Sequence, residues 1–519
     1  MTARKPCPPA PGPLEAYAGG FDEVYESLAQ RRAFRDYLAG LLLPRDRNKT
    51  LTAVAGAEPV LGAQQPNAQR LQFFLSESAW DADAVNARRL ALLFGDPATA
   101  PHAGGVLVLD DTGDRKAGTK TAHVARQYLG SVGKIDNGIV AVTTLWADER
   151  VYTPLHVVPS TPARRLPRGN RNPAFRTKPQ LAVELVAAAQ AADVPFRAVA
   201  ADCSYGDNLG FEEALAGAGI PFVLALKPAK GTWAPVDQAH TPEEAARRLR
   251  WGGPADPRDW TAVTRRFRDG HEERWWAADA RLAGYGPDRA VRLVVVTADP
   301  ATLPPLATWY LATNLPRPGA PHSARATAVP FPPAALAEVV RLYGLRIWVE
   351  QGYKQVKDEL GWADFQVRAD RAIRRHWTLV LCAFSFCWRA WFAARDTAWP
   401  PPPPDADLPP HQAAGAPPAL PAVSPAVPHP GTAGGEKARA AAGTAAPPAP
   451  TPTGTTAVAR LAGRPAPRPE LARALDHALA HLARLVHGGP TARPPMAARP
   501  RRRRLQPASL SPLLTNYRY

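Results

Sequence analysis

The sequence has few cysteines and no long apolar run, and both absences narrow the class of protein. Its 519 residues include four cysteines, and none of them forms a CxxC pair or a Cys/His cluster with the spacing of a zinc site. Structural zinc and a disulfide framework are therefore not expected. No stretch approaches the roughly 18 uninterrupted apolar residues of a transmembrane helix, and the N-terminal MTARKPCPPAPG lacks the apolar core of a signal peptide. A reducing cytoplasm is the expected compartment.

Acidic residues are too few to balance the basic ones. The chain has 63 Lys and Arg against 46 Asp and Glu, which gives a formal net charge of +17. An excess of this size favours a polyanionic partner, with nucleic acid first and an anionic membrane second. Hydrophobic residues make up 45% of the chain, enough for a substantial core, and the length allows about three domains.

The first hundred residues are interpreted as a short disordered N-terminus, residues 1–19, and a helical domain, residues 20–100. In FDEVYESLAQRRAFRDYLAGLLL, apolar residues recur at helical spacing, with Arg31, Arg32 and Arg35 between them. A second helix, ADAVNARRLALLF, has Asp81 or Asp83 as its cap. Basic helical faces fit DNA binding and plain packing about equally, and we assign this segment as a helical DNA-binding domain.

Residues 101–229 alternate between strand and helix patterns. GVLVLDD, FRAVAADCSYGD and PFVLALKP are typical of strands, and two β-rich runs around Asp148-Glu149 are typical of a hairpin. PQLAVELVAAAQAADVP and FEEALAGAG are typical of helices. The predicted order is β-β-β-α-β-α-β, so the fold class is α/β.

The predicted secondary structure changes over the next hundred residues. Residues 230–330 indicate a β-rich insertion with a hairpin at Asp269-Gly270. Four of its tryptophans, Trp251, Trp260, Trp275 and Trp276, fit stacking on a flipped base, although packing of a small β unit is favoured. Residues 331–397 are predicted to form helices.

The C-terminal part has the composition of a chain without a core. Residues 398–456 are rich in Pro, Ala and Gly, which predicts a disordered Pro/Ala-rich linker. Residues 457–519 contain an isolated helix and a basic tail with Arg501 to Arg504. The basic run fits contact with nucleic acid, but a solvated tail is the favoured interpretation.

A stripe of four side chains is the most informative local pattern. Tyr343, Arg346, Glu350 and Lys357 stand at successive spacings of 3, 4 and 7, which places them within roughly 60° of one another on a single α-helix. Taken alone, such a stripe is usually a solvated face with i,i+4 ion pairs of a few tenths of a kcal/mol.

Two further acids follow predicted strands and give the stripe another meaning. Asp110 ends one apolar run and Asp202 ends another, and side chains at the carboxyl ends of strands in an open α/β sheet converge on one crevice. With Glu350 on a later helix, this order is the layout of an RNase H-like core interrupted by a β-rich insertion. Oxygen ligands suit Mg²⁺ or Mn²⁺, and a two-metal site supports in-line phosphoryl transfer.

These residues resemble a known family, the bacterial insertion-sequence transposases of the DDE class (DDE superfamily endonucleases). The stripe matches the Y-x(2)-R-x(3)-E-x(6)-K signature without a gap. LVLDDTGDRKAGTKTAHVARQYLGSVGKIDNG resembles the strand-D-x-T segment, VAADCSYGD the second strand-D segment, and RADRAIRRHWTLVLCAFSF the region after the signature. The resemblance covers roughly residues 20–395, and the 148 residues from Asp202 to Glu350 leave room for the family's β-rich insertion.

The resemblance implies roles for particular residues. Asp110, Asp202 and Glu350 match the catalytic triad that binds two Mg²⁺ (or Mn²⁺) ions per active site. Asp111 is adjacent to the first acid, and Asp110 is preferred because it leaves D-x-T intact with Thr112. Signature positions that touch DNA near the cleaved end are matched by Tyr343, Arg346 and Lys357.

Weaker candidates for phosphate contacts are isolated bases, and for each of them a solvated surface residue is the favoured interpretation. These are Lys116, Arg126, Lys134, Arg374 and Arg375. His123 and His376 have no acid or serine at a diagnostic spacing and are interpreted as structural or phosphate-proximal.

The function that the resemblance implies is DNA transposition. Such an enzyme binds the terminal inverted repeats of its element, hydrolyses a phosphodiester at each end and joins the 3′-hydroxyls to target DNA. Double-stranded DNA is the expected partner, a dimer is expected in the synaptic complex, no membrane is involved, and the expected location is the cytoplasm, at the bacterial nucleoid. The alternatives are a domesticated, catalytically silent DNA-binding protein and a structure-specific DNA nuclease on the same fold.

Overall fold

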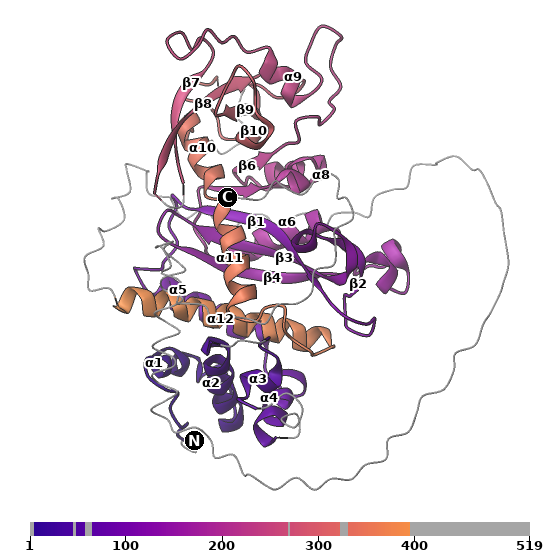
Figure 1. Ribbon diagram of the computed structural model, residues 1–519, viewed down its shortest axis with the longest axis vertical. Coiled ribbons are helices and arrows are strands. Elements are labelled where there is room, and N and C mark those ends of the chain that lie inside the picture. The colour runs from indigo at the N-terminus through magenta and orange to yellow at the C-terminus, as the bar shows by residue number, and fades with distance from the viewer. Residues whose placement is uncertain (1–4, 45–47, 58–64, 268–269, 322–330, 395–519) are drawn as a thin grey trace, which may run out of the picture.

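One large mixed sheet dominates the computed structural model, which describes residues 5–44, 48–57, 65–267, 270–321 and 331–394 (Figure 1). The strand order is β2-β3-β1-β5-β6-β10-β9-β8-β7, and β4 also pairs with β3. Helices pack around the sheet, so this part of the chain has the predicted α/β class.

The first half of the sheet forms from the most apolar segments. The first four residues of β1 and all four of β5 are buried, as expected for strands covered on both faces. β1, β5 and β6 run parallel, and β3 is antiparallel to β1 and β4. These strands and their connecting helices are β1 Val106–Arg115, β2 Ala125–Leu129, β3 Lys134–Ala147, β4 Tyr152–Ser160, α6 Lys178–Ala191, β5 Ala198–Ala201, α7 Cys203–Gly206, α8 Leu209–Gly217 and β6 Phe222–Ala225.

Strand β2 is absent from the predicted order. It is five residues long, and Arg126 and Tyr128 on it are exposed. It pairs with the first residues of β3, so a tertiary hydrogen-bond partner creates a strand where the local hydrophobic pattern is weak.

The strands of the predicted insertion extend the same sheet. β10 pairs with β6 through Leu311 and Ala225, and β9, β8 and β7 follow outward. Trp260, Trp275 and Trp276 are buried, which fits the packing interpretation of the insertion tryptophans. The elements of this region are α9 Pro242–Arg247, β7 Thr261–Arg266, β8 Glu272–Ala280, β9 Arg292–Thr297 and β10 Thr308–Thr313.

The N-terminal helices form a separate layer below the sheet (Figure 1). They are α1 Leu14–Ala18, α2 Leu28–Leu42, α3 Leu51–Val54, α4 Pro66–Ser76 and α5 Ala82–Phe94. Asp81 caps α5, one of the two predicted alternatives. Helix α1 corrects the prediction for residues 1–19, because Leu14 and Tyr17 are buried within a segment that was expected to be disordered.

Two of the three arginines predicted to give α2 a basic face are internal. Arg35 is 3% exposed and bonds to Glu15 at 2.7 Å and to Asp22 at 2.6 Å. Arg31 is also buried and donates to the Lys5 carbonyl. Arg32 remains exposed. The cluster therefore serves mainly the packing of α1 and α2.

Helix α12, Asp370–Ala394, lies between the N-terminal helices and the sheet (Figure 1). Its His376 bonds to Tyr37 of α2 at 2.8 Å. Its Ser385 accepts from Arg89 of α5, which also donates to the Leu155 carbonyl of β4 at 2.7 Å. Polar bonds inside an apolar interface thus fix the helical layer to the sheet.

The signature stripe spans two helices rather than one. α10 is Leu336–Gly344 and α11 is Ile347–Asp358. At the junction the Arg346 N–H donates to the Tyr343 carbonyl and the Val349 N–H to the Arg346 carbonyl, which are the shorter bonds of a 3₁₀ turn. The prediction of a single helix from Tyr343 to Lys357 is therefore wrong at this point, and Tyr343 belongs to a different helix from Glu350.

The predicted linker, the isolated late helix and the Arg501 to Arg504 run lie outside the described residues. Among the helices that are described, none combines the length and apolar character needed to cross a bilayer.

Two neighbouring arginines of α12 provide a test of this packing. Arg375 is buried, donates to the carbonyls of Leu75 and Trp80 and stacks on the Trp80 ring at 4.6 Å. We expect Arg375→Ala to lower the free energy of unfolding by about 3 kcal/mol, because buried carbonyls lose a charged donor.

Arg374→Ala is the matched control. Its side chain is 41% exposed and pairs with Asp370 one turn away, so we expect a change of at most about 0.5 kcal/mol. Urea unfolding followed by circular dichroism measures both variants. Equal stability of the two would contradict the structural assignment of Arg375.

Candidate active site

Two carboxylates follow the point where the parallel pairing of β1 and β5 ends, although β1 itself continues to Arg115, so the prediction that Asp110 stands at a strand end is wrong. The last paired residues of β1 and β5 are Leu109 and Ala201, and Asp110 and Asp202 follow them in the chain. Strand β5 ends there because the Asp202 carboxylate caps α7 and accepts the Ser204 N–H at 2.9 Å. Parallel pairing therefore brings together two acids that are 92 positions apart.

Arg346 connects the first of these acids to the acid on α11. Its guanidinium lies 3.2 Å from Asp110 and 3.3 Å from Glu350. The arginine and aspartate side chains are 17% and 15% exposed, whereas Glu350 is 56% exposed. Because Arg346 stands at the α10–α11 junction, the turn between the helices places its charge among the acids.

The buried charged groups in this cluster shift one another's pKa values. Burial raises the pKa of Asp110 to about 7; Arg346 opposes the rise, while Asp202 and Asp111 add to it. Burial alone would lower the pKa of Arg346, but the facing groups, led by Asp110, hold it above its usual value. The arginine therefore remains charged, and the state of Asp110 depends on which cation faces it.

Asp111 points away from this cluster. Successive residues of a strand face opposite sides of a sheet. The Asp111 carboxylate accordingly lies 3.1 Å from the Lys178 ammonium of α6 and 3.5 Å from the Tyr205 hydroxyl of α7. The two adjacent aspartates thus have different partners on different faces.

The other two signature side chains are held within the protein. The Tyr343 ring packs edge-on against Trp309 at 5.0 Å, and burial raises its pKa to about 12. The Lys357 ammonium lies 2.7 Å from the Asp114 carboxylate, which is 5% exposed. The Gly113 carbonyl accepts from the same ammonium at 3.2 Å. Lys357 therefore anchors the end of α11 to β1.

Most of the weaker phosphate candidates also have internal partners. Lys116 donates to the carbonyls of Ala363 and Phe365, and burial lowers its pKa to about 8. Arg375 is buried in the interface of α12, and Arg374 is paired with Asp370. Arg126 and Lys134 are the exposed members of the set.

The two histidines have structural environments. His123 lies 2.8 Å from the Thr161 hydroxyl and 2.7 Å from the Asp370 carboxylate. His376 is fully buried between Tyr37 and the Gly361 carbonyl, and burial lowers its pKa to about 4. Both therefore join distant segments of the chain.

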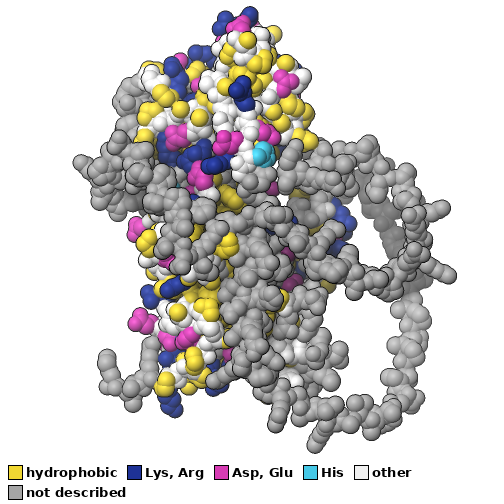
Figure 2. Space-filling model, turned by 60° about the vertical axis from the view of Figure 1, so that its left-hand side comes forward, with side chains coloured by type: hydrophobic (Ala, Val, Ile, Leu, Met, Phe, Trp, Pro, Cys, Tyr) yellow, Lys and Arg dark blue, Asp and Glu magenta, His cyan; other side chains and the backbone are white. Residues whose placement is uncertain are grey.

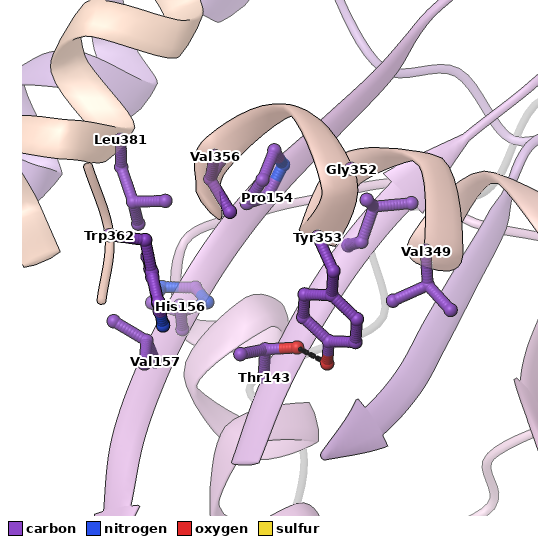
Figure 3. A pocket seen from close by; sticks show the side chains of 11 residues that line it. Thr143, Pro154, His156, Val157, Val349, Gly352, Tyr353, Val356, Trp362 and Leu381 are labelled. Atoms are coloured by element: carbon purple, nitrogen blue, oxygen red, sulfur yellow. Dashed lines mark hydrogen bonds between the residues drawn. The ribbon is translucent and has the colours of Figure 1, made fainter. Parts of the chain in front are cut away.

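The residues around a small cavity between α11 and the sheet show how this helix packs on the sheet (Figure 3). A Cβ on Gly352 would stand 3.0 Å from the Leu145 side chain, so glycine permits a close approach to β3. The Tyr353 hydroxyl bonds to Thr143 at 2.5 Å, and Thr143 is the β3 partner of Asp110. Tyr353 was not identified from the sequence, although it follows Glu350 by three residues and so lies one turn further along the helix.

Carboxylate oxygens are the ligands that Mg²⁺ and Mn²⁺ prefer, so the residue types fit a divalent metal. Within the described residues, however, no group of three or more His, Cys, Asp or Glu is arranged to hold an ion. The position of Arg346 between Asp110 and Glu350 explains the separation of these acids.

Two comparisons with known proteins show what the chain is similar to. The model of the DDE superfamily endonuclease family matches residues 23–281, a segment that contains Asp110 and Asp202 and ends before Glu350. A probable transposase for insertion sequence element IS701 from Microchaete diplosiphon is 29% identical over 368 residues, which cover 71% of this chain and 85% of that protein. The family match and the similarity over most of the chain together support the resemblance to insertion-sequence transposases of the DDE class.

Proposed function

We propose that this protein binds the terminal inverted repeats of its insertion sequence, hydrolyses a phosphodiester at each end and transfers the freed 3′-hydroxyls to target DNA. The observation that carries the proposal is that Arg346 pairs with both Asp110 and Glu350, while Asp202 follows the strand β5 that pairs with β1. The similarity to a probable transposase supports the same activity. Two DNA ends must be held together, so a dimer is proposed for the synaptic complex.

The strand order supports an RNase H-like catalytic core. Antiparallel β3 flanks the parallel strands β1, β5 and β6, with acids on β1, after β5 and on α11. We assign residues 101–229 and 331–397 to this core and residues 230–330 to the β-rich insertion. Residues 20–100 are proposed as the helical DNA-binding domain, with exposed bases such as Arg32 rather than Arg35 facing DNA.

Asp110, Asp202 and Glu350 are the residues proposed to hold two Mg²⁺ or Mn²⁺ ions. When bound, such ions activate the attacking oxygen and stabilise the leaving oxygen of an in-line displacement. The acids can close on one another only after Arg346 releases Asp110 or Glu350. The freed guanidinium then lies beside the site, and its planar fork suits a DNA phosphate.

Asp110 is proposed as the first acid in preference to Asp111. Asp110 shares the α11 face of the sheet with Arg346. Asp111 is paired with Lys178 on the other face. The bond between Tyr353 and Thr143 fixes α11 beside the β1 segment that carries Asp110, so Tyr353 is proposed as a positioning residue.

Neutral variants of the second and third acids test the catalytic assignment. We expect Asp202→Asn and Glu350→Gln each to leave duplex binding largely intact. Loss of a residue that only contacts a metal ligand typically costs roughly 10–100-fold. Cleavage in Mg²⁺ by these two variants should fall by more than that. Glu184→Gln, an exposed carboxylate of α6, is the matched control.

Cleavage of a labelled duplex that carries the element's end measures the effect. Retained cleavage by either acid variant would contradict the catalytic assignment of Asp202 and Glu350. A wild-type protein that binds the ends without cutting them would favour the catalytically silent alternative. Cutting without joining of pre-cut ends to target DNA would favour the nuclease.

The two adjacent aspartates make a sharper comparison. We expect Asp110→Asn to abolish cleavage, because this variant alters the face of β1 that meets Arg346. We expect Asp111→Asn to keep activity within about tenfold of the wild type, because it alters contacts with Lys178 and Tyr205 away from Arg346. The reverse order of the two activities would assign the first acid to Asp111.

The raised pKa of Asp110, about 7 against an ordinary 3.8, predicts pH-dependent metal binding. Below pH 7 the metal must displace a proton, so Mn²⁺ affinity should rise by about tenfold per pH unit from pH 5 to 7 and then level off. In the metal-free protein, Asp110 binds a proton between pH 4 and 7 that it would not bind in the unfolded chain. The contribution of Asp110 to the free energy of unfolding, measured as the difference between the wild type and Asp110→Asn, should therefore fall as pH rises through this window.

Electron paramagnetic resonance of free Mn²⁺ at pH 5, 6, 7 and 8 measures the affinity. Asp110→Asn should flatten the pH dependence. A wild-type affinity that does not change between pH 5 and 7 would contradict a buried, protonated Asp110.

A further inference from the structure

The loop from β4 to α6 carries an uncompensated positive charge. Five exposed arginines lie between Ser160 and Lys178, on and around the short helices η4, Ala163–Arg165, and η5, Gly169–Arg171. They are Arg164, Arg165, Arg168, Arg171 and Arg176. Arg176 pairs with Glu184 at 2.7 Å. Among the described residues the other four, here called the arginine loop, have no acidic partner.

Several exposed arginines of the β7–β10 region have acidic partners. Arg250 pairs with Asp259 at 2.8 Å and Arg258 with Asp256 at 2.9 Å. Figure 2 shows basic and acidic side chains mixed over the upper part of the molecule, where this region lies. The arginine loop therefore differs from these paired arginines in having no acidic side chain bonded to it within the part of the chain that the structure describes.

The arginine loop packs against the β2–β3 hairpin. Arg164 donates to the Arg126 carbonyl, and Arg165 donates to the carbonyls of Thr119 and Thr121 at 3.1 and 3.0 Å. These bonds to main-chain carbonyls thus occupy some of the hydrogen-bond donors of Arg164 and Arg165. Loop and hairpin form one surface.

The hairpin adds exposed bases and apolar groups to that surface. Tyr128 and Ile135 are cross-strand partners, 58% and 60% exposed. Arg126 and Lys134 are exposed beside them. Basic side chains around an exposed aromatic and aliphatic pair are typical of proteins that contact a DNA groove.

Strand β1 connects this surface to the candidate active site. Strand β1 leads from Asp110 to Arg115, a rise of about 17 Å for five residues. Arg115 pairs with Gly138, which also pairs with Ala125 of β2. At its other end the segment with the arginine loop leads into α6, where Lys178 contacts Asp111 on the opposite face of β1 from Asp110. A duplex rises about 3.4 Å per base pair, so the surface begins about five base pairs from Asp110.

We propose that the arginine loop and the β2–β3 hairpin bind the phosphate backbone of the duplex that flanks the cleaved end. The inference rests on the proposed function and adds to it the path of the DNA. The contacts are to phosphates, because the loop offers cations without an arrangement that would read base edges. Binding here is therefore independent of sequence and strongly dependent on salt.

The experiment measures the salt dependence of binding by the full chain. A fluorescein-labelled duplex of about 30 base pairs is titrated at several KCl concentrations from about 50 to 200 mM. The double variant Arg168→Ala/Arg171→Ala removes two cations that make no side-chain hydrogen bond among the described residues. Arg250→Ala/Arg258→Ala, from the β7–β10 region, is the matched control.

Each phosphate contact contributes about 0.9 to the magnitude of the slope of log affinity against log salt. The slope of the loop variant should therefore be smaller in magnitude by about 1.8. Its affinity deficit at 50 mM should then shrink about 12-fold by 200 mM, while the control keeps the wild-type slope. A second variant, Arg126→Ala/Lys134→Ala, should also reduce the slope. Thermal unfolding checks that every variant is folded.

A wild-type slope in both the loop and the hairpin variants would overturn the inference and leave the proposed function standing. An equal loss of slope in the control would also overturn it, because the effect would then be general. A wild-type protein that binds no duplex would overturn the inference and the proposed function together. Normal duplex binding without cleavage would count against the function alone.

Discussion

The charge of Arg346 is the constraint on which the candidate site depends. A guanidinium that is largely removed from water must be paired, because an isolated buried charge costs several kcal/mol. Here the partners come from different parts of the fold, Asp110 from β1 and Glu350 from α11. The pairing therefore requires β1 to stand beside α11 and requires the turn that ends α10. In the free protein, a cation supplied by the chain faces the acids.

The rest of α11 is built to keep that arrangement in place. Tyr353 bonds to Thr143 in its middle, Gly352 allows contact with β3, and Lys357 pairs with the buried Asp114 at its end. These anchors lie along about one and a half turns of the helix, so a rotation of α11 would break them. A signature that looks like a DNA-contacting stripe thus also encodes the attachment of a helix to a sheet.

Some of this could be predicted from sequence and some could not, for physical reasons. Asp110 and Asp202 were identified because uninterrupted apolar runs mark buried strands, and strand ends in an α/β sheet converge. The break at Arg346 was missed because helical periodicity continues through it. The internal partners of Lys116, Lys357 and Arg375 were missed because they lie on distant segments, and a base in a sequence looks the same whether it faces water or a carbonyl group. The arginine loop has no periodic pattern, and its lack of acidic partners is visible only in three dimensions.

The pairing of β10 with β6 has a consequence for the evolution of the chain. Strand β6 is fully buried, with a register of only three residues to β10. If the insertion were lost, an apolar strand would become the bare edge of the sheet and a template for association with other chains. The β7–β10 region is thus also a cover for the catalytic sheet. A shortened relative would need another protected edge, such as a charged residue or a proline in the strand that corresponds to β6.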